Sequence, residues 1–369
     1  MMLAMVWAAP SCQPPTAPDV DSIDIPVEPP PASSAFRVVG YHPYWSGDEW
    51  RRYDFSLLDA VYFFSLDAGS DGSITETHGW PNDWSELRAT AAAAGVPVVP
   101  TVAILAADTF RAVFSSQQAS DRLVETLVAL ALEPGTGGLH LDFEMFDPVD
   151  ADVRNRVTYV VRSVRERIRG MKPDFTLSAF ALANDPAEVF DEAGMASWVD
   201  YLVVQGYDFH WIGGDVAGPV APLEGWNGQN WHGVTDRYLA AGIPKEKILF
   251  TVPYYGYEWP AESEEPGART TGRGIEITYA PVRSDLPSAR DRAAEFGKRR
   301  DPGSGSPYYV TRDSTGWRQG WFEDAESLSR KYDFVRERGL RGIAVFPMAY
   351  GDEQLDASLV QPRAAMVGR

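Results

Sequence analysis

One segment of the chain places three ionisable side chains at every second position of a predicted strand. In Gly138–Glu144, the side chains of His140, Asp142 and Glu144 alternate with leucine and phenylalanine. Because successive side chains of a strand point to opposite faces, these three groups share one face. Two carboxylates on one face repel each other, and the simplest outcome is that one keeps a proton near neutral pH. A carboxyl group that is protonated near neutrality is what general acid catalysis requires.

Two other interpretations of these side chains remain open. The carboxylates could form a buried structural pair, although acidic residues are rarely buried without a partner or a function. Alternatively, His140, Asp142 and Glu144 could ligate a metal ion. The chain has only five histidines, and none of them forms a pair at metal-ligand spacing. We therefore expect a catalytic pair that uses no metal and no cofactor.

Eight short apolar runs along the chain predict eight β-strands. They are Arg37–His42, Ala60–Ser65, Val96–Val102, Gly138–Glu144, Phe175–Ala181, Tyr201–Tyr207, Lys247–Pro253 and Gly342–Pro347. Segments with helical periodicity lie between them, namely Trp84–Ala94, Asp121–Leu132, Ala151–Met171, Thr235–Ala241 and Asp324–Arg338. This alternation predicts an α/β fold in which parallel strands close into a (β/α)8 TIM barrel. Catalytic groups of such barrels lie at the carboxyl ends of strands, where Glu144 falls.

The interval between the seventh and eighth predicted strands is too long for a simple loop. Residues 256 to 320 contain the strand-like pieces Gly274–Tyr279 and Pro307–Thr311 among Pro, Gly and charged residues. We expect a small α+β insertion here that forms one wall of a cleft. The acidic residues at the start of this interval are expected to form a solvated loop, and they are Glu258, Glu262, Glu264 and Glu265.

The first 35 residues differ in composition from the rest of the chain. An apolar run ends at Cys12, and its last residues resemble a bacterial lipoprotein cleavage site. Residues 1–12 are therefore expected to be a signal segment with Cys12 as the lipidated residue, while plain secretion and an intracellular location are the alternatives. Residues 13–35 are rich in proline and predict an extended tether. The folded domain should span 36–369 in an extracytoplasmic protein, either secreted or anchored to a membrane.

Charge and aromatic content restrict the partner of the folded domain. A formal net charge of -19 repels phosphates, so nucleic acid is not expected as a partner and a neutral polymer fits better. Solubility alone is the alternative explanation of the acidity. The 12 Trp, 16 Tyr and 17 Phe residues are enough to build both a core and a binding cleft. The oligomeric state stays open.

Several motifs in order resemble one known family. Residues 137–144 resemble the Asp-Gly-x-Asp-x-Asp-x-Glu signature of family 18 glycoside hydrolases, the chitinase-like group, with Gly and His in place of the first two aspartates. The resemblance is closest in character to bacterial members directed at the cell wall. It extends over residues 36 to 352 through Gly40–Trp45, Gln205–Asp208, Pro253–Trp259, Trp321–Leu328 and Gly339–Phe346.

The resemblance implies retaining, substrate-assisted hydrolysis of β-linked N-acetylglucosamine glycans, either peptidoglycan or chitin. In this family the acetamide of the substrate takes the place of an enzyme nucleophile. By this resemblance Glu144 is the acid and base, Asp142 orients the acetamide, and Tyr207 hydrogen-bonds it. Asp208 also matches the motif, but simple strand alternation points it away from Tyr207, so only a supporting role is expected.

A further set of residues is expected to contact the glycan. It comprises Tyr41, Trp45, His140, Gln205, Asp208, Trp211, Tyr257, Trp259 and Phe346. The tryptophans Trp45, Trp211 and Trp259 follow strand ends, so we expect them in the cleft, with packing on the barrel rim as the alternative.

Two of these residues depart from the family pattern. His140 stands where the family has aspartate or asparagine, and it is expected to hydrogen-bond Asp142 or, when protonated, to hold it ionised. Phe346 replaces a tryptophan beneath the central sugar and offers a smaller surface for stacking. These departures leave a non-catalytic, lectin-like barrel open as the alternative function.

Overall fold

The computed structural model describes residues 36–360. The predicted signal segment, Cys12 and the predicted tether lie outside the described residues, so these three expectations stay predictions. Within residues 36–360, none of the helices has the length and apolar character needed to span a membrane.

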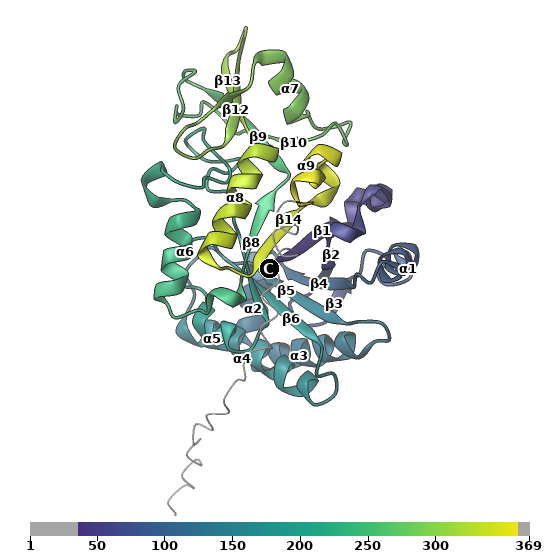
Figure 1. Ribbon diagram of the computed structural model, residues 1–369. Helices are drawn as coiled ribbons and strands as arrows, with labels where there is room; N and C mark the ends of the chain where they lie inside the picture. The colour runs from purple at the N-terminus through teal and green to yellow at the C-terminus, as the bar shows by residue number, and fades with distance from the viewer. Residues whose placement is uncertain (1–35, 361–369) are drawn as a thin grey trace, which may run out of the picture. The chain divides into compact units, whose positions relative to one another are not determined.

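Eight parallel strands form a closed barrel. They are β1 (Arg37–Pro43), β2 (Ala60–Ala68), β4 (Val98–Ile104), β5 (Gly138–Phe143), β6 (Thr176–Ala181), β7 (Tyr201–Val204), β8 (Ile248–Pro253) and β14 (Gly342–Phe346). Neighbours follow the order β1-β14-β8-β7-β6-β5-β4-β2, and β2 pairs back with β1 to close the sheet. The short strand β3 (Ile74–Glu76) adds an antiparallel edge to β2. All eight predicted strands are present, and the predicted (β/α)8 barrel is confirmed (Figure 1).

Helices surround the barrel strands in Figure 1. The α-helices outside the insertion are α1 (Ser85–Ala93), α2 (Ala107–Ser115), α3 (Gln117–Leu132), α4 (Ala151–Arg169), α5 (Glu192–Ala196), α6 (Trp231–Ala240), α8 (Ala325–Arg338) and α9 (Glu353–Ser358). Short 3-10 helices are η1 (Tyr44–Arg52), η2 (Phe55–Leu57), η3 (Trp226–Gly228), η4 (Lys245–Lys247) and η5 (Met348–Tyr350). Helices α2, α5 and α9 were not among the predicted segments.

Helix α8 shows how local sequence sets its ends. The Asp324 side chain accepts a hydrogen bond from the Ser327 backbone N–H, and the Asp324 backbone N–H donates to the Ser327 hydroxyl. Together these two bonds form a capping box. At the other end Gly339 adopts a left-handed conformation with φ 68°, which glycine tolerates without a Cβ clash. The chain then enters β14 directly.

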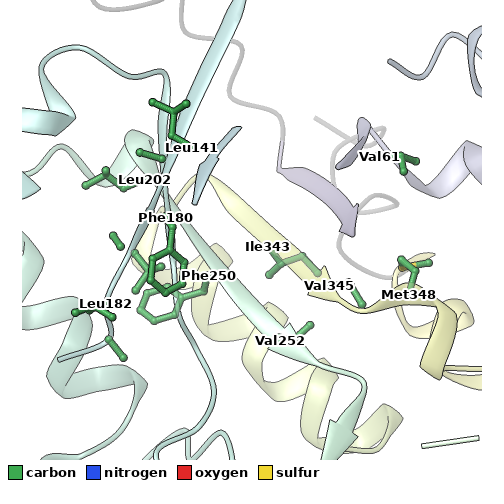
Figure 2. Packing of buried hydrophobic residues seen from close by; sticks show 14 of the residues in the cluster. Val61, Leu141, Phe180, Leu182, Leu202, Phe250, Val252, Ile343, Val345 and Met348 are labelled. Atoms are coloured by element: carbon green, nitrogen blue, oxygen red, sulfur yellow. The ribbon is translucent and has the colours of Figure 1, made fainter. Parts of the chain in front are cut away.

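Strand alternation divides the core into two apolar layers. On β14, Ile343 and Val345 face the surrounding helices, while Ala344 and Phe346 face the barrel interior. Figure 2 shows the outer layer, in which Ile343 and Val345 lie with side chains of neighbouring strands. The interior layer is mostly aromatic and aliphatic, and consists of Val39, Tyr41, Ala60, Tyr62, Phe64, Val99, Tyr201, Val203, Leu249 and Ala344. These side chains fill the barrel, so the cleft must lie at its end rather than inside it.

The insertion between β8 and β14 is built on an antiparallel sheet. Its strands are β9 (Tyr255–Ala261), β10 (Ile275–Thr278), β11 (Arg299–Arg300), β12 (Pro307–Asp313) and β13 (Gly316–Trp321), paired in the order β10-β9-β13-β12-β11. Helix α7 (Ala289–Phe296) completes it. Figure 1 shows these elements together at one end of the barrel. The predicted α+β insertion is therefore confirmed.

The expectation of a solvated acidic loop is wrong for Glu258. Its side chain is 1% exposed, because β9 continues through this position and packs against β13. The carboxylate accepts hydrogen bonds from the Arg292 guanidinium at 2.5 Å and from the Tyr309 hydroxyl at 2.7 Å. Glu258 therefore holds the insertion together instead of facing water.

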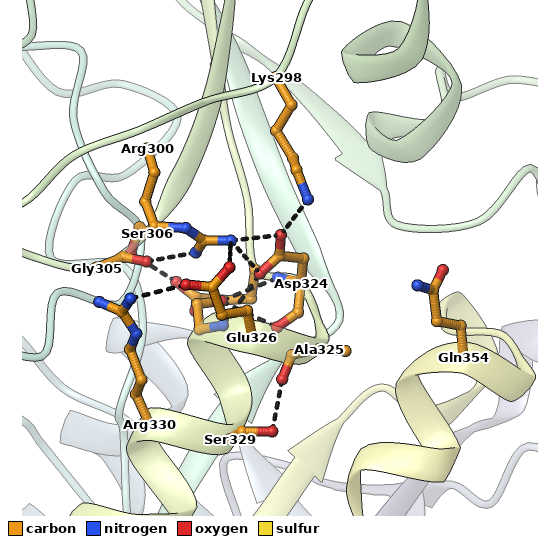
Figure 3. A network of polar contacts seen from close by, with 12 residues as sticks. Lys298, Arg300, Gly305, Ser306, Asp324, Ala325, Glu326, Ser329, Arg330 and Gln354 are labelled. Atoms are coloured by element: carbon orange, nitrogen blue, oxygen red, sulfur yellow. Dashed lines mark hydrogen bonds and ion pairs between the residues drawn. The ribbon is translucent and has the colours of Figure 1, made fainter.

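A polar network joins the insertion to the start of α8 (Figure 3). Lys298 and Arg300, from the insertion, pair with the Asp324 carboxylate at 2.8 and 2.9 Å. A second ion pair joins Lys331 and Glu323 at 2.6 Å, with both side chains 0% exposed. These contacts fix the insertion to the barrel at the point where the chain returns to it.

Candidate active site

A cleft of about 1280 Å³ opens at the carboxyl ends of the barrel strands. Its walls come from the loops that follow β1, β5, β6, β7 and β14, and from the insertion. This volume exceeds the roughly 300–1,000 Å³ that is usual for small-molecule sites. The cleft is therefore large enough for a ligand longer than a single small molecule.

Asp142 and Glu144 both line this cleft. Asp142 lies on β5, and Glu144 follows directly after its last residue, Phe143. The Glu144 backbone N–H donates to the Ile104 carbonyl of β4 at 2.9 Å, which holds its backbone in line with the strand. Among the described residues, none forms a hydrogen bond with the buried Asp142 Oδ1. A buried acceptor without a partner costs free energy, so this oxygen is available to a ligand donor.

Burial sets the protonation of the two carboxyl groups. It raises the pKa of Glu144 to about 7, and the negative charge of Asp208 adds to this rise. The pKa of Asp142 is also raised, first by burial and then by the charge of Glu144. Both shifts favour retention of a proton by the pair near neutral pH.

Asp208 lies in the cleft, and the expectation that it points away is wrong. Strand β7 ends at Val204, and Asp208 has a left-handed backbone with φ 60°, so strand alternation does not reach it. Its Oδ1 accepts hydrogen bonds from the hydroxyls of Tyr255 at 2.7 Å and Tyr257 at 3.0 Å. Burial raises the pKa of Asp208 to about 6, although these two hydrogen bonds oppose the rise.

His140 does not line the cleft, and its expected hydrogen bond to Asp142 is wrong. The imidazole is fully buried below the two carboxylates, with Nε2 2.8 Å from the Tyr41 hydroxyl and Nδ1 2.9 Å from Ser178 Oγ. Burial lowers the pKa of His140 to about 3, so the ring is neutral near pH 7. Neutral His140 thus holds Tyr41 in place and does not ionise Asp142.

Aromatic rings form the base of the cleft. Phe346 lies 6.0 Å from Tyr207 in a nearly parallel arrangement and 5.5 Å from Tyr41 edge to face, measured between ring centroids. Tyr41, Gln205, Tyr207 and Phe346 all line the cleft, as does Tyr257 from the insertion. Burial raises the pKa of the Tyr207 hydroxyl well above its usual value, which keeps it a hydrogen-bond donor.

The three predicted tryptophans have different positions. Trp45 and Trp211 line the cleft and are 41% and 53% exposed, so their rings are available for stacking. Trp259 is 0% exposed, and its indole N–H donates to the Trp211 carbonyl at 3.2 Å. It lies within β9 of the insertion sheet, not after a strand end, so its expected place in the cleft is wrong.

Sequence reasoning missed several polar residues that reach the cleft, including Glu276, Arg283 and Tyr350. Glu276 and Arg283 come from the insertion, and Tyr350 comes from the loop after β14. The Tyr350 hydroxyl lies 3.2 Å from the Trp45 indole nitrogen and 3.3 Å from Arg283 Nη1, both of which donate to it. Only Glu276 carries a signal in the sequence, because it is the polar residue between Ile275 and Ile277 on a predicted strand.

No group of three or more His, Cys, Asp or Glu side chains within residues 36–360 is placed to hold a metal ion. The Asp142 and Glu144 carboxylates, the buried Tyr207 hydroxyl and the aromatic base together suit acid chemistry on a ligand with flat apolar faces. The family model described as glycosyl hydrolases family 18 matches residues 37–351. The chain belongs to glycosyl hydrolase family 18.

Two individual proteins are similar to this chain in sequence. The putative sporulation-specific glycosylase YdhD of Bacillus subtilis (strain 168) is 29% identical over 244 residues, which are 65% of this chain and 53% of YdhD. The cortical fragment-lytic enzyme of Bacillus anthracis is 23% identical over 302 residues, covering 78% of this chain and 64% of that enzyme. This family 18 chain thus matches between about half and two thirds of the length of these relatives.

A solved structure shows the same fold. The class V chitinase from Nicotiana tobaccum, in complex with NAG4, superposes with a TM-score of 0.76 at 17% identity, over 88% of this chain and 97% of that one. At this identity the likeness establishes the fold that family 18 members share, and no more.

Proposed function

We propose that this chain is a retaining glycosidase that cleaves β-linked N-acetylglucosamine glycans of the peptidoglycan or chitin type. The observation that carries the proposal is the pKa of Glu144, which burial and Asp208 raise to about 7 at the open end of the barrel. Family membership, and the similarity to a cortical fragment-lytic enzyme and to a chitinase in complex with NAG4, support this substrate class.

In the proposed mechanism, Glu144, Asp142 and Tyr207 each act on a defined atom of the substrate or of water. The protonated Glu144 gives its proton to the glycosidic oxygen as the bond to the anomeric carbon breaks. The acetamide oxygen of the same sugar attacks that carbon, and the acetamide N–H donates to Asp142 Oδ1, which has no partner among the described residues. The Tyr207 hydroxyl donates to the acetamide oxygen. The Glu144 carboxylate then takes a proton from water, which opens the ring intermediate.

The stereochemistry of the first product tests this mechanism. We expect NMR of chito-oligosaccharide digests to show the β-anomer before mutarotation, because two displacements at one carbon retain its configuration. Reducing-end release from peptidoglycan, measured in parallel, chooses between the two polymers. Initial release of the α-anomer would contradict the mechanism. Binding of both glycans with no turnover would instead support the alternative function, a lectin-like barrel.

The pH profile of kcat/KM should depend on Asp208. Glu144 must be protonated to act as the acid, so we expect activity to fall as pH rises through about 7. In Asp208→Asn the negative charge is lost, the pKa of Glu144 decreases, and this alkaline limb moves to lower pH. The exposed Asp147 carries the same charge outside the cleft lining, so Asp147→Asn should leave the limb in place. An unmoved limb in Asp208→Asn would refute the electrostatic link.

We also propose that the protein is secreted and lipidated at Cys12. Both proposals rest on the sequence of residues 1–35 alone. An extracytoplasmic location would place the cleft in the compartment that holds polymers of this class.

A further inference from the structure

The charges that line the cleft are unbalanced. Among the cleft-lining residues of the described chain, one is basic, Arg283, and the acidic ones are Asp142, Glu144, Asp185, Asp208 and Glu276. Arg283 is already engaged, because its guanidinium donates to both carboxylate oxygens of Asp285 at 3.0 and 2.6 Å. A ligand carboxylate would therefore meet several negative charges and a cation that already has a partner.

Glu276 differs from the other cleft carboxylates in its position and its contacts. It lies on β10 directly opposite Tyr257 of β9, and opposite residues of an antiparallel pair project from the same face. This face borders the cleft, because Tyr257 lines it and binds Asp208. Among residues 36–360, none donates a hydrogen bond to the Glu276 carboxylate or forms a close ion pair with it, and Arg283, which is bound to Asp285, attracts it only at longer range. Its oxygens are thus free to accept hydrogen bonds from a ligand.

The surroundings of Glu276 favour ligand donors over ligand anions. A half-buried carboxylate gains from sugar hydroxyl or amide N–H donors, since hydrogen bonds to charged groups are the stronger ones. A ligand carboxylate at the same place would be repelled by Glu276, and by Asp208 behind Tyr257. Because the cleft is partly shielded from water, this repulsion is screened less than on an open surface.

We propose that Glu276 is a specificity-determining residue that selects neutral N-acetylated oligosaccharides and excludes those with a carboxylate beside the cleaved sugar. This inference rests on the proposed function, and it narrows the substrate class of the same cleft. A chitin-type glycan matches this selection, and so does a glycan whose lactyl carboxylates are capped as amides, whereas a glycan with free lactyl carboxylates on every second sugar does not.

Binding measurements with matched ligands test the inference without requiring turnover. One ligand is a tetrasaccharide of alternating N-acetylglucosamine and N-acetylmuramic acid with free lactyl carboxylates. The other is the same tetrasaccharide with those carboxylates converted to amides. Calorimetry at low ionic strength uses protein that carries Glu144→Gln, so that neither ligand is cleaved. We expect the amide form to bind about tenfold more tightly, and this ratio should shrink as salt is added.

Two variants in the same background locate the source of the selection. Glu276→Gln keeps the size of the side chain and should reduce the ratio between the two affinities several-fold. Glu262→Gln removes one charge from an exposed position of the insertion outside the cleft lining, and should leave the ratio unchanged.

Two results would overturn the inference. An unchanged ratio in Glu276→Gln would do so while leaving the proposed hydrolysis intact, since turnover is measured separately on the unmodified chain. Failure of the neutral tetrasaccharide to bind would also overturn the inference, while turnover of chito-oligosaccharides and peptidoglycan by the unmodified chain decides the proposed function separately.

Discussion

Replacement of Glu144 by glutamine should lower kcat for chito-oligosaccharides by about 10²- to 10⁴-fold, the usual contribution of a general acid. Glutamine fills the same space at the end of β5 and cannot transfer a proton. The change corresponds to about 3–5 kcal/mol of transition-state stabilisation. Initial rates of reducing-end release measure it, and calorimetry with an uncleaved oligosaccharide should show that binding remains.

The control for this loss is a glutamate of the same barrel that lies away from the cleft. Glu166 lies on the outer face of α4, where its side chain is 54% exposed. Glu166→Gln should retain full activity. A Glu144→Gln protein that folds, binds sugar and still turns over at more than a tenth of the normal rate would exclude Glu144 as the proton donor.

Replacement of Lys331 by methionine should destabilise the protein by about 3–5 kcal/mol, because it leaves the fully buried Glu323 without its cation. Of its side-chain partners among residues 36–360, Glu323 would keep the hydrogen bond from Ser306 Oγ, at 2.8 Å. Denaturant titration followed by circular dichroism measures the loss as a lower unfolding midpoint.

Two further variants separate the buried charge from lost packing. Arg330→Met breaks an exposed pair with Glu326 on the same helix and should cost only about 0.3–0.5 kcal/mol. The double variant Lys331→Met, Glu323→Leu removes both charges and should regain much of the lost stability. A loss below about 1 kcal/mol in Lys331→Met would show that water or other groups compensate Glu323.

The barrel could be predicted because each of its buried strands carries a local signal. Apolar runs such as Ile343 to Val345 predict a buried strand without any knowledge of the neighbouring strand. Glycines that follow helices indicate where those helices end. The conformations of Gly95, Gly242 and Gly339, with φ of 75°, 81° and 68°, agree with that reading.

Three of the errors arose where alternation was carried past the end of a strand or where the neighbouring strand was unknown. Asp208 was placed wrongly because β7 stops at Val204. Trp259 was expected in the cleft and Glu258 in a solvated loop, yet the pairing of β9 with β13 buries both. That pairing joins residues about 60 positions apart, and local patterns contain no information on such distant contacts.

The two connections between the barrel and its insertion determine how rigid the cleft is when a glycan binds. A single residue, Tyr254, separates β8 from β9, and Glu323 follows β13 by two positions before the chain enters α8. The wall that carries Tyr257 and Glu276 is thus a direct extension of barrel strands, held at its return by a buried ion pair. This wall of the cleft is therefore preorganised. A sugar chain binds to a surface that already has its shape, so little binding energy is spent on ordering the protein.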